Sequence, residues 1–137
     1  MNQTEKRLYL IKELLSEQPR YQNIEIPSGA QGQKDLLRSL MNVRMPAPVS
    51  DEYVRIESEY LKEEAAAKGI THLADLTPVE DGIYLWQGDI TTLECDAIVN
   101  AANSGMTGCY VPCHNCIDNT MPYPITHRFA SCVRASA

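Results

Sequence analysis

The sequence predicts a mixed α/β chain, with a helical segment over residues 1–80 and an α/β segment over residues 81–137. Two observations support this division. Apolar residues recur at helical spacing in the first segment, whereas the second segment contains short continuous apolar runs that are typical of buried strands. All five cysteines fall in the second segment, from Cys95 onward, so the two segments also differ in the chemistry they offer.

Three helices are expected in the first segment. The first is followed by a loop over residues 18–32, which contains proline and glycine breakers. The second is expected near residues 34–43 and must end before the two prolines of the MPAPVS segment. Ser50 is expected to cap the third helix and Gly69 to end it. The predicted apolar stripe of the third helix consists of Tyr53, Ile56, Tyr60 and Ala67.

Two short apolar runs in the second segment are expected to form buried strands. One spans residues 83–86, and the other is DAIVNAA at residues 96–102. Periodicity alone does not separate a buried strand from a buried helix in runs this short. At about 30 residues for each βαβ unit, the chain after residue 82 accommodates one unit and part of another. A closed sheet of five or six strands therefore does not fit in this segment.

Composition and charge exclude two classes of function. The chain of 137 residues has a formal net charge of −6 and no basic stripe, which disfavours a long nucleic acid as ligand. It contains no run of 18 or more apolar residues, so no membrane span is predicted. The N-terminus is amphipathic and lacks the uncharged apolar core of a signal peptide, and we therefore expect a cytoplasmic protein.

Four potential metal ligands fall within eight residues. Zinc takes cysteine thiolate and histidine imidazole in tetrahedral geometry. In an extended segment residues two apart share a face, so His114 and Cys116 can hold one ion, and Pro112 could turn the chain to bring Cys109 to it. The preferred ligand set is Cys109, His114 and Cys116, which leaves a fourth position for water or substrate. The alternatives are a structural site that also uses Cys113, and buried free cysteines that bind no metal.

Two further motifs follow the apolar runs. In WQGDIT, Asp89 could accept hydrogen bonds from a base amino group or a ribose hydroxyl, although a turn aspartate or a helix N-cap fits the pattern equally well. In VNAANSG, small residues would let a ligand approach the backbone, and asparagines offer donors and acceptors to ribose hydroxyls. An ordinary loop is the alternative there. Neither motif is specific by itself.

The motifs together resemble a known family. GDIT followed by an apolar strand and NAAN is similar to the signature of macrodomains. GCYVPCHNCIDN resembles the zinc-dependent, bacterial, sirtuin-linked branch, and LRSLMNVRMPAPVSDEY and ADLTPVEDGIYLWQGDI resemble the N-terminal extension of that branch. The resemblance covers residues 5–119 and implies a three-layer α/β/α macrodomain preceded by a helical extension. After CIDN the sequence departs from the pattern at two prolines, so the macrodomain is expected to be truncated in its C-terminal half. Missing central strands would leave an open sheet edge and an exposed apolar face, so we expect low solubility, poor stability and weak or no catalysis of this chain alone.

The resemblance implies a hydrolase that removes mono-ADP-ribose from modified proteins with a bound Zn²⁺ ion. Asp89 would hold the adenine amino group with help from the Ile90 backbone, and Asn103 would bind the distal ribose. Zinc would be held beside that ribose by Cys109, His114 and Cys116. Ile117 and Asp118 would lie against the ligand, with Asp118 near the diphosphate, and the implied catalytic residues are Asn103 and Asp118.

The resemblance also implies partners. These are ADP-ribose or a mono-ADP-ribosylated protein, for which a lipoylated carrier protein is one candidate, and a sirtuin-like ADP-ribosyl transferase in the same pathway. No nucleic acid and no membrane are expected as partners. The alternative function is an ADP-ribose-binding or zinc-binding remnant that lacks catalytic activity because the C-terminal half is missing.

Overall fold

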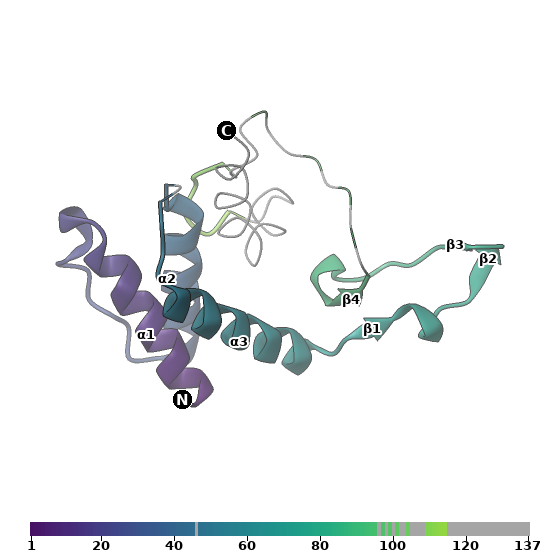
Figure 1. Cartoon of the computed structure of the whole chain (residues 1–137), viewed down its shortest axis with the longest axis horizontal. Helices are drawn as coiled ribbons and strands as arrows, with labels where there is room; N and C mark the ends of the chain where they lie inside the picture. The colour runs from purple at the N-terminus through teal and green to yellow at the C-terminus, as the bar shows by residue number, and fades with distance from the viewer. Residues whose placement is uncertain are drawn as a thin grey trace.

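A computed structural model describes residues 1–45, 47–95, 97, 99, 101, 104 and 109–114. Three helices come first: α1 (Gln3–Ser16), α2 (Ala30–Val43) and α3 (Asp51–Lys68). Four short strands follow: β1 (Thr71–His72), β2 (Pro78–Glu80), β3 (Ile83–Tyr84) and β4 (Leu93–Glu94). Single turns of 3₁₀ helix are η1 (Pro19–Tyr21), η2 (Leu73–Asp75) and η3 (Ile90–Thr92). The helices pack together, and the strands form an arm that extends from the end of α3 (Figure 1).

The helix boundaries follow from local capping. Asn2 and Glu5 form a capping box at the start of α1, with distances of 2.9 Å from Glu5 N to Asn2 Oδ1 and 2.8 Å from Asn2 N to Glu5 Oε2. The predicted cap of α3 is confirmed, because Ser50 Oγ accepts a hydrogen bond from Tyr53 N at 3.1 Å. Gly69 ends α3 with a φ of 91°, a conformation that favours glycine.

The predicted start of the second helix was four residues too late. Helix α2 begins at Ala30 after an N-cap at Gly29, so Gly32 lies inside the helix and not in the preceding loop. A Cβ atom at Gly32 would lie 2.8 Å from Pro27 Cβ, closer than real Cβ contacts. Gly32 therefore allows the loop to pack closely on the first turn of α2. It was expected in the loop because glycine tends to interrupt helices.

The hydrophobic core lies between the three helices. Leu10 and Ile11 of α1, Leu37 of α2 and Ile56 of α3 are its most completely buried residues. Burial of apolar surface on this scale is the main stabilising term for such a unit. The predicted stripe of α3 is confirmed for Tyr53, Ile56 and Tyr60 but is wrong for Ala67, which is exposed because the C-terminal turns of α3 extend beyond the other two helices.

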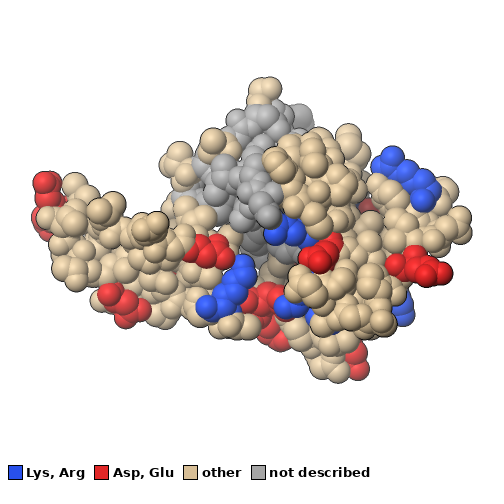
Figure 2. Space-filling view, turned by 180° about the vertical axis from the view of Figure 1, so that it is seen from behind, with Lys and Arg blue, Asp and Glu red and all other residues tan. Residues whose placement is uncertain are grey.

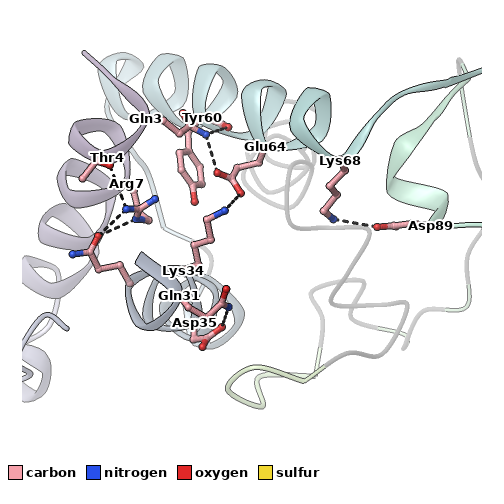
Figure 3. A network of polar contacts seen from close by, with 11 residues as sticks. Gln3, Thr4, Arg7, Gln31, Lys34, Asp35, Tyr60, Glu64, Lys68 and Asp89 are labelled. Carbon is pink, nitrogen blue, oxygen red and sulfur yellow. Dashed lines mark hydrogen bonds and ion pairs between the residues drawn. The ribbon is translucent and has the colours of Figure 1, made fainter. Parts of the chain in front are cut away.

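Polar contacts tie the helices together around this core. The buried guanidinium of Arg7 donates to Gln33 Oε1 through Nε at 3.0 Å and Nη2 at 2.9 Å, and Gln33 Nε2 donates to Pro27 O at 2.9 Å. Glu64 of α3 accepts from Gln3 Nε2 at 3.1 Å and pairs with Lys34 Nζ at 2.6 Å (Figure 3). Each of these contacts links two of the three helices or the loop before α2.

The residues after α3 form two separate ladders. Strands β1 and β4 pair in parallel with Thr71 opposite Leu93, and β2 and β3 pair as an antiparallel hairpin. The helical interpretation of residues 1–80 therefore holds as far as Lys68, since β1 and β2 also lie before residue 81. The chain is of mixed helix and sheet composition, as the sequence predicts, whereas the three-layer arrangement stays a prediction.

The strand predictions were only partly right. Of residues 83–86, only Ile83 and Tyr84 form a strand, and the run is exposed rather than buried, with Leu85 83% exposed. The hairpin lies on the arm, away from the core that the three helices form (Figure 1). Within the predicted strand at 96–102, the described residues Ala97, Val99 and Ala101 are exposed and belong to no helix or strand; the others lie outside the described residues.

Charged side chains of both signs lie on the surface of the described residues. On the face shown in Figure 2, acidic and basic side chains are interspersed among the described residues and form no broad basic patch. None of the helices in the described part of the chain combines the length and apolar character needed to cross a bilayer.

Candidate functional site

An open hollow lies where α3 meets the arm. Its volume is about 610 Å³. The hollow is shallow, closer to a flat surface than to an enclosed cavity. The hollow combines backbone, one cation, one carboxylate and one indole, which are groups that suit a polar ligand with an aromatic part. It is lined by Lys68, Gly69, Ile70, Thr71, Trp86, Gln87, Gly88, Asp89 and Thr92.

Asp89 lies at the edge of this hollow and caps η3. Its Oδ1 accepts hydrogen bonds from Thr91 N at 3.0 Å and Thr91 Oγ1 at 2.7 Å. Its Oδ2 forms an ion pair with Lys68 Nζ at 3.1 Å, and Figure 3 shows these two side chains pointing toward each other. The Thr91 hydroxyl, then the Thr91 N–H and the Lys68 ammonium, lower the pKa of Asp89 below its usual value. Asp89 is therefore a carboxylate at neutral pH.

The glycine before Asp89 has a structural reason. A Cβ atom at Gly88 would lie 2.2 Å from Trp86 Cζ2 and 2.8 Å from Trp86 Cε2 and Cη2. The indole of Trp86 thus lies directly against the Gly88 backbone, and only glycine leaves room for it. Half-buried Trp86 and exposed Asp89 are in this way presented at the same hollow.

Two of the three predicted metal ligands lie next to each other. Cys109 Sγ is 3.1 Å from His114 Nδ1, and a turn with a hydrogen bond from His114 N to Val111 O at 3.2 Å brings them together. A thiolate and an imidazole in a tetrahedral zinc site lie about 3.5 Å apart. The pair therefore fits two ligand positions of one zinc ion with a small adjustment. Cys113 points elsewhere, with its Sγ 2.9 Å from Ser39 Oγ of α2.

The remaining predicted site residues, Asn103, Cys116, Ile117 and Asp118, lie outside the described residues. Ile90 is described and forms the first residue of η3, directly after Asp89. Within residues 1–114 as far as they are described, no group of three or more His, Cys, Asp or Glu side chains is placed to hold a metal ion. The third ligand position expected of Cys116 thus stays a prediction.

Sequence reasoning assigned no role to Lys68 and Trp86, although both line the hollow. A signal for Lys68 was present: it is the last lysine or arginine before Arg128, so it is the one such cation near the WQGDIT motif in the sequence. Trp86 is the single tryptophan and lies two residues before the glycine that its ring requires. The ion pair between Lys68 and Asp89 depends on how α3 ends, and the WQGDIT motif does not determine the end of that helix.

The two candidate groups contact different helices. Asp89 contacts the last residue of α3, whereas the Cys109–His114 segment contacts α2 (Figure 1). The arrangement offers a binding hollow with a carboxylate and, separately, a thiol–imidazole pair of zinc-ligand type.

Similar proteins were found among curated sequences. No family model matches the chain. Along most of its length, however, the chain is similar to curated proteins that are named protein-ADP-ribose hydrolase. The chain spans about half the length of the curated relatives it matches.

Three relatives illustrate this similarity. A protein-ADP-ribose hydrolase of Treponema medium is 54% identical over 134 residues, which are 95% of this chain and 49% of the relative. One of Staphylococcus aureus (strain MRSA252) is 45% identical over 112 residues, 81% of this chain and 42% of the relative. A probable bifunctional ADP-ribose hydrolase/ADP-ribosyltransferase of Fusarium oxysporum f. sp. cubense is 39% identical over 95 residues, 61% of this chain and 16% of the relative.

Proposed function

We propose that this chain takes part in the hydrolysis of ADP-ribose from modified proteins, as part of a zinc-dependent macrodomain. The observation that supports this most strongly is the 54% identity, over 95% of the chain, to a protein named protein-ADP-ribose hydrolase. The motifs GDIT, NAAN and the Cys/His segment lie within this similar stretch.

The hollow suits the adenosine end of ADP-ribose. Among the described residues, Asp89 Oδ2 accepts one hydrogen bond, from Lys68, and a carboxylate oxygen can accept two. An adenine amino group can therefore donate to Asp89 without displacing Lys68 or Thr91. The apolar face of Trp86 supplies a surface for the base at the same hollow. In this arrangement Lys68 and Thr91 hold the carboxylate in place, and Asp89 selects the base.

The metal part of the proposal rests on the donor set. Cys109 and His114 are zinc ligands by type and lie 3.1 Å apart, and Cys116 would supply the third. Bound zinc would supply a Lewis acid that orients ribose hydroxyls or lowers the pKa of a water molecule. Asn103 would hold the distal ribose, and Asp118 would lie at the diphosphate, which makes these two the candidate catalytic residues. Ile90 and Ile117 would line the ligand.

The partners follow from the substrate. An enzyme that removes ADP-ribose from a protein requires an ADP-ribosyl transferase that attaches it, and we propose a sirtuin-like transferase acting in the cytoplasm. The name of the Fusarium relative, which joins ADP-ribose hydrolase to ADP-ribosyltransferase, supports such a pairing. A lipoylated carrier protein is the proposed modified protein.

The test uses the full chain and a protein mono-ADP-ribosylated by a sirtuin-like transferase. Released ADP-ribose is measured by mass spectrometry, and zinc per chain by elemental analysis. We expect about one zinc ion per chain, since one open three-ligand site is proposed, and slow release of ADP-ribose, since weak catalysis is expected of this chain alone. Both should be lost in Cys109→Ser and His114→Ala. Cys95→Ser is the matched control, because Cys95 is exposed and forms no disulfide, and it should retain both properties.

Two other results would change the proposal. Binding of free ADP-ribose by calorimetry without any release would replace the hydrolase with the alternative, a binding module that lacks turnover. A folded chain that binds neither zinc nor ADP-ribose would overturn both. Asp89→Asn separates the hollow from the metal: it should weaken ADP-ribose binding and leave zinc content unchanged.

A further inference from the structure

We propose that Cys113 is the residue that anchors the metal-binding loop to helix α2, and that it is not a metal ligand. The loop is defined as residues 109–114, and the surface it contacts is defined as the α2 docking stripe, formed by Asp35, Arg38, Ser39 and Asn42. The inference assigns the helical segment a function: it positions Cys109 and His114. It rests on the proposed function only where it concerns zinc, since the contact between loop and helix is independent of the metal.

The docking stripe has the spacing of one helix face. Its four residues stand at positions i, i+3, i+4 and i+7 of α2, which bring them to one side of a helix. The stripe contacts three residues of the loop. Arg38 Nη2 donates to His114 O and Asn42 Nδ2 donates to Val111 O, both at 3.4 Å, and the third contact is made by Cys113. The opposite side of α2, with Leu37, Leu40 and Met41, belongs to the core. The loop therefore lies on the outer face of a rigid element.

Cys113 makes the shortest of these contacts. Its Sγ lies 2.9 Å from Ser39 Oγ and donates to the backbone carbonyl of Asp35 at 3.3 Å. Both partners of the Cys113 thiol belong to α2, whereas the side chain of His114 lies 3.1 Å from Cys109 Sγ. These contacts place Cys113 in the anchoring role.

The backbone of the loop explains how neighbouring side chains separate. Cys113 has a φ of 52° and Tyr110 a φ of 54°, both in the left-handed region that residues other than glycine rarely adopt. Such strained positions persist where surrounding contacts hold them. The left-handed turn at Cys113 directs its thiol to α2, while the side chain of His114 lies beside Cys109. The order Cys-His at positions 113 and 114 thus supplies one anchor and one ligand.

Figure 1 shows the consequence for the whole molecule. The loop, in light green, lies beside α2 although the two are far apart in the sequence. A loop held in its binding geometry before the metal arrives loses less conformational freedom on binding, which strengthens affinity. The α2 docking stripe therefore raises zinc affinity without a ligand of its own.

The test compares zinc affinity, by competition with a chelator, with hydrogen–deuterium exchange of residues 109–114, on the full chain. Cys113→Ser keeps a donor at this position but removes the thiol, and it should bind zinc within about twofold of the unchanged chain, whereas Cys109→Ser should lose the metal. Cys113→Ala and Ser39→Ala each remove the side-chain contact. Each should weaken zinc binding about three- to tenfold, the size of one net hydrogen bond, and speed exchange in the loop. The double variant should lose little more than either single one.

Ser28→Ala is the matched control for Ser39→Ala, because Ser28 is exposed in the loop before α2. It should change neither quantity. Loss of zinc in Cys113→Ser equal to that in Cys109→Ser would show that Cys113 is a ligand and would overturn the assignment. Unchanged loop exchange in both Cys113→Ala and Ser39→Ala would overturn the docking. Hydrogen–deuterium exchange of the loop is measured without metal as well. The contact between the loop and α2 is therefore tested even if the unchanged chain binds no zinc and the proposed metal site fails.

Discussion

The helices at residues 3–68 and the arm at residues 69–95 differ in what holds them in place. The helices share one core, in which residues from all three are almost inaccessible to water. The arm has strands of two or three residues, and Val79, Ile83 and Leu85 expose half or more of their surface. Because stability follows buried apolar area, the helices are a folding unit, whereas the arm depends on what packs against it.

The polar contacts of the two regions differ in the same way. In the helical unit, charged groups such as Arg7 and Arg44 are buried and form several hydrogen bonds. In the arm, the two ion pairs, Lys68 with Asp89 and His72 with Glu94, are formed by largely exposed side chains. Water and salt screen such pairs, so they add orientation more than stability. The candidate hollow therefore lies at the end of a well-packed helix, α3, but it is lined mainly by residues of the arm, which few buried contacts hold in place.

The largest expected effect is on the core. Leu37→Ala should lower the free energy of unfolding by about 2–5 kcal/mol, because Leu37 is completely buried and the cavity would not be filled. Urea denaturation followed by circular dichroism at 222 nm measures this. Leu85→Ala on the arm is the matched control and should change stability by less than about 0.5 kcal/mol. Equal losses in the two variants would mean that the arm is packed like the core.

A smaller effect is expected at the junction of α2 and the segment before α3. Arg44, whose side chain is 5% exposed, pairs with Glu17 through Nε at 2.8 Å and Nη2 at 2.8 Å and also donates to Ala47 O at 3.1 Å. Arg44→Ala should cost about 1.5–3 kcal/mol in unfolding free energy, the range for hydrogen bonds to charged groups. Arg44→Lys should rescue little, because lysine lacks the planar fork.

Arg55→Ala serves as the control for that experiment. Arg55 pairs with Glu59 on the exposed face of α3, so its loss should change the denaturation midpoint far less. If Arg44→Ala proved as mild as Arg55→Ala, the segment between α2 and α3 would be held by its prolines rather than by this arginine.

The smallest expected effect is a pH dependence in the arm. Glu94, opposite His72 on the β1–β4 ladder, raises the pKa of His72 above its ordinary value through a side-chain hydrogen bond. A raised pKa in the folded state means that the pair stabilises the ladder below the ordinary pKa of about 6.5. That contribution disappears as the pH rises through the higher, folded-state pKa.

NMR titration of the His72 ring measures this directly, with His72→Asn used to assign the signal. The midpoint should fall toward its ordinary value in Glu94→Gln, and chain stability should change little because both side chains are exposed. An identical midpoint in the two proteins would show that the His72 and Glu94 side chains do not pair in solution.

The sequence was most informative where local chemistry decides the structure. Helix α3 begins after Ser50 and ends before Gly69, as predicted, because a side-chain cap and a left-handed glycine act within one turn of the helix. The start of α2 was misplaced because Gly32 is a breaker by local preference but is required here by Pro27. The apolar run at 83–86 was wrongly expected to be buried, since periodicity reports what a segment could bury and not whether a partner is present.

The candidate site was predictable to a similar degree. Ligand type and a turn near Pro112 predicted that Cys109 and His114 hold one zinc ion; the two side chains lie 3.1 Å apart, and the metal site stays a prediction. The separation of Cys113 from that pair was expected from extended alternation, but the structure achieves it with a left-handed residue and a helix contact. Neither the Ser39 contact nor the Lys68–Asp89 pair could be foreseen, because both join residues far apart in the chain and depend on helix orientation.

The parallel pairing of Thr71 with Leu93 has a consequence for the order of events on the ribosome. All three helices have been synthesised once residue 68 is made, and helical units of this kind fold in microseconds to milliseconds. Strand β1 must wait for β4, which at about 5–20 residues per second is synthesised one to four seconds later. During that interval β1 has no partner strand. We therefore expect the three helices to be folded already while β1 still waits for β4, the strand with which it pairs.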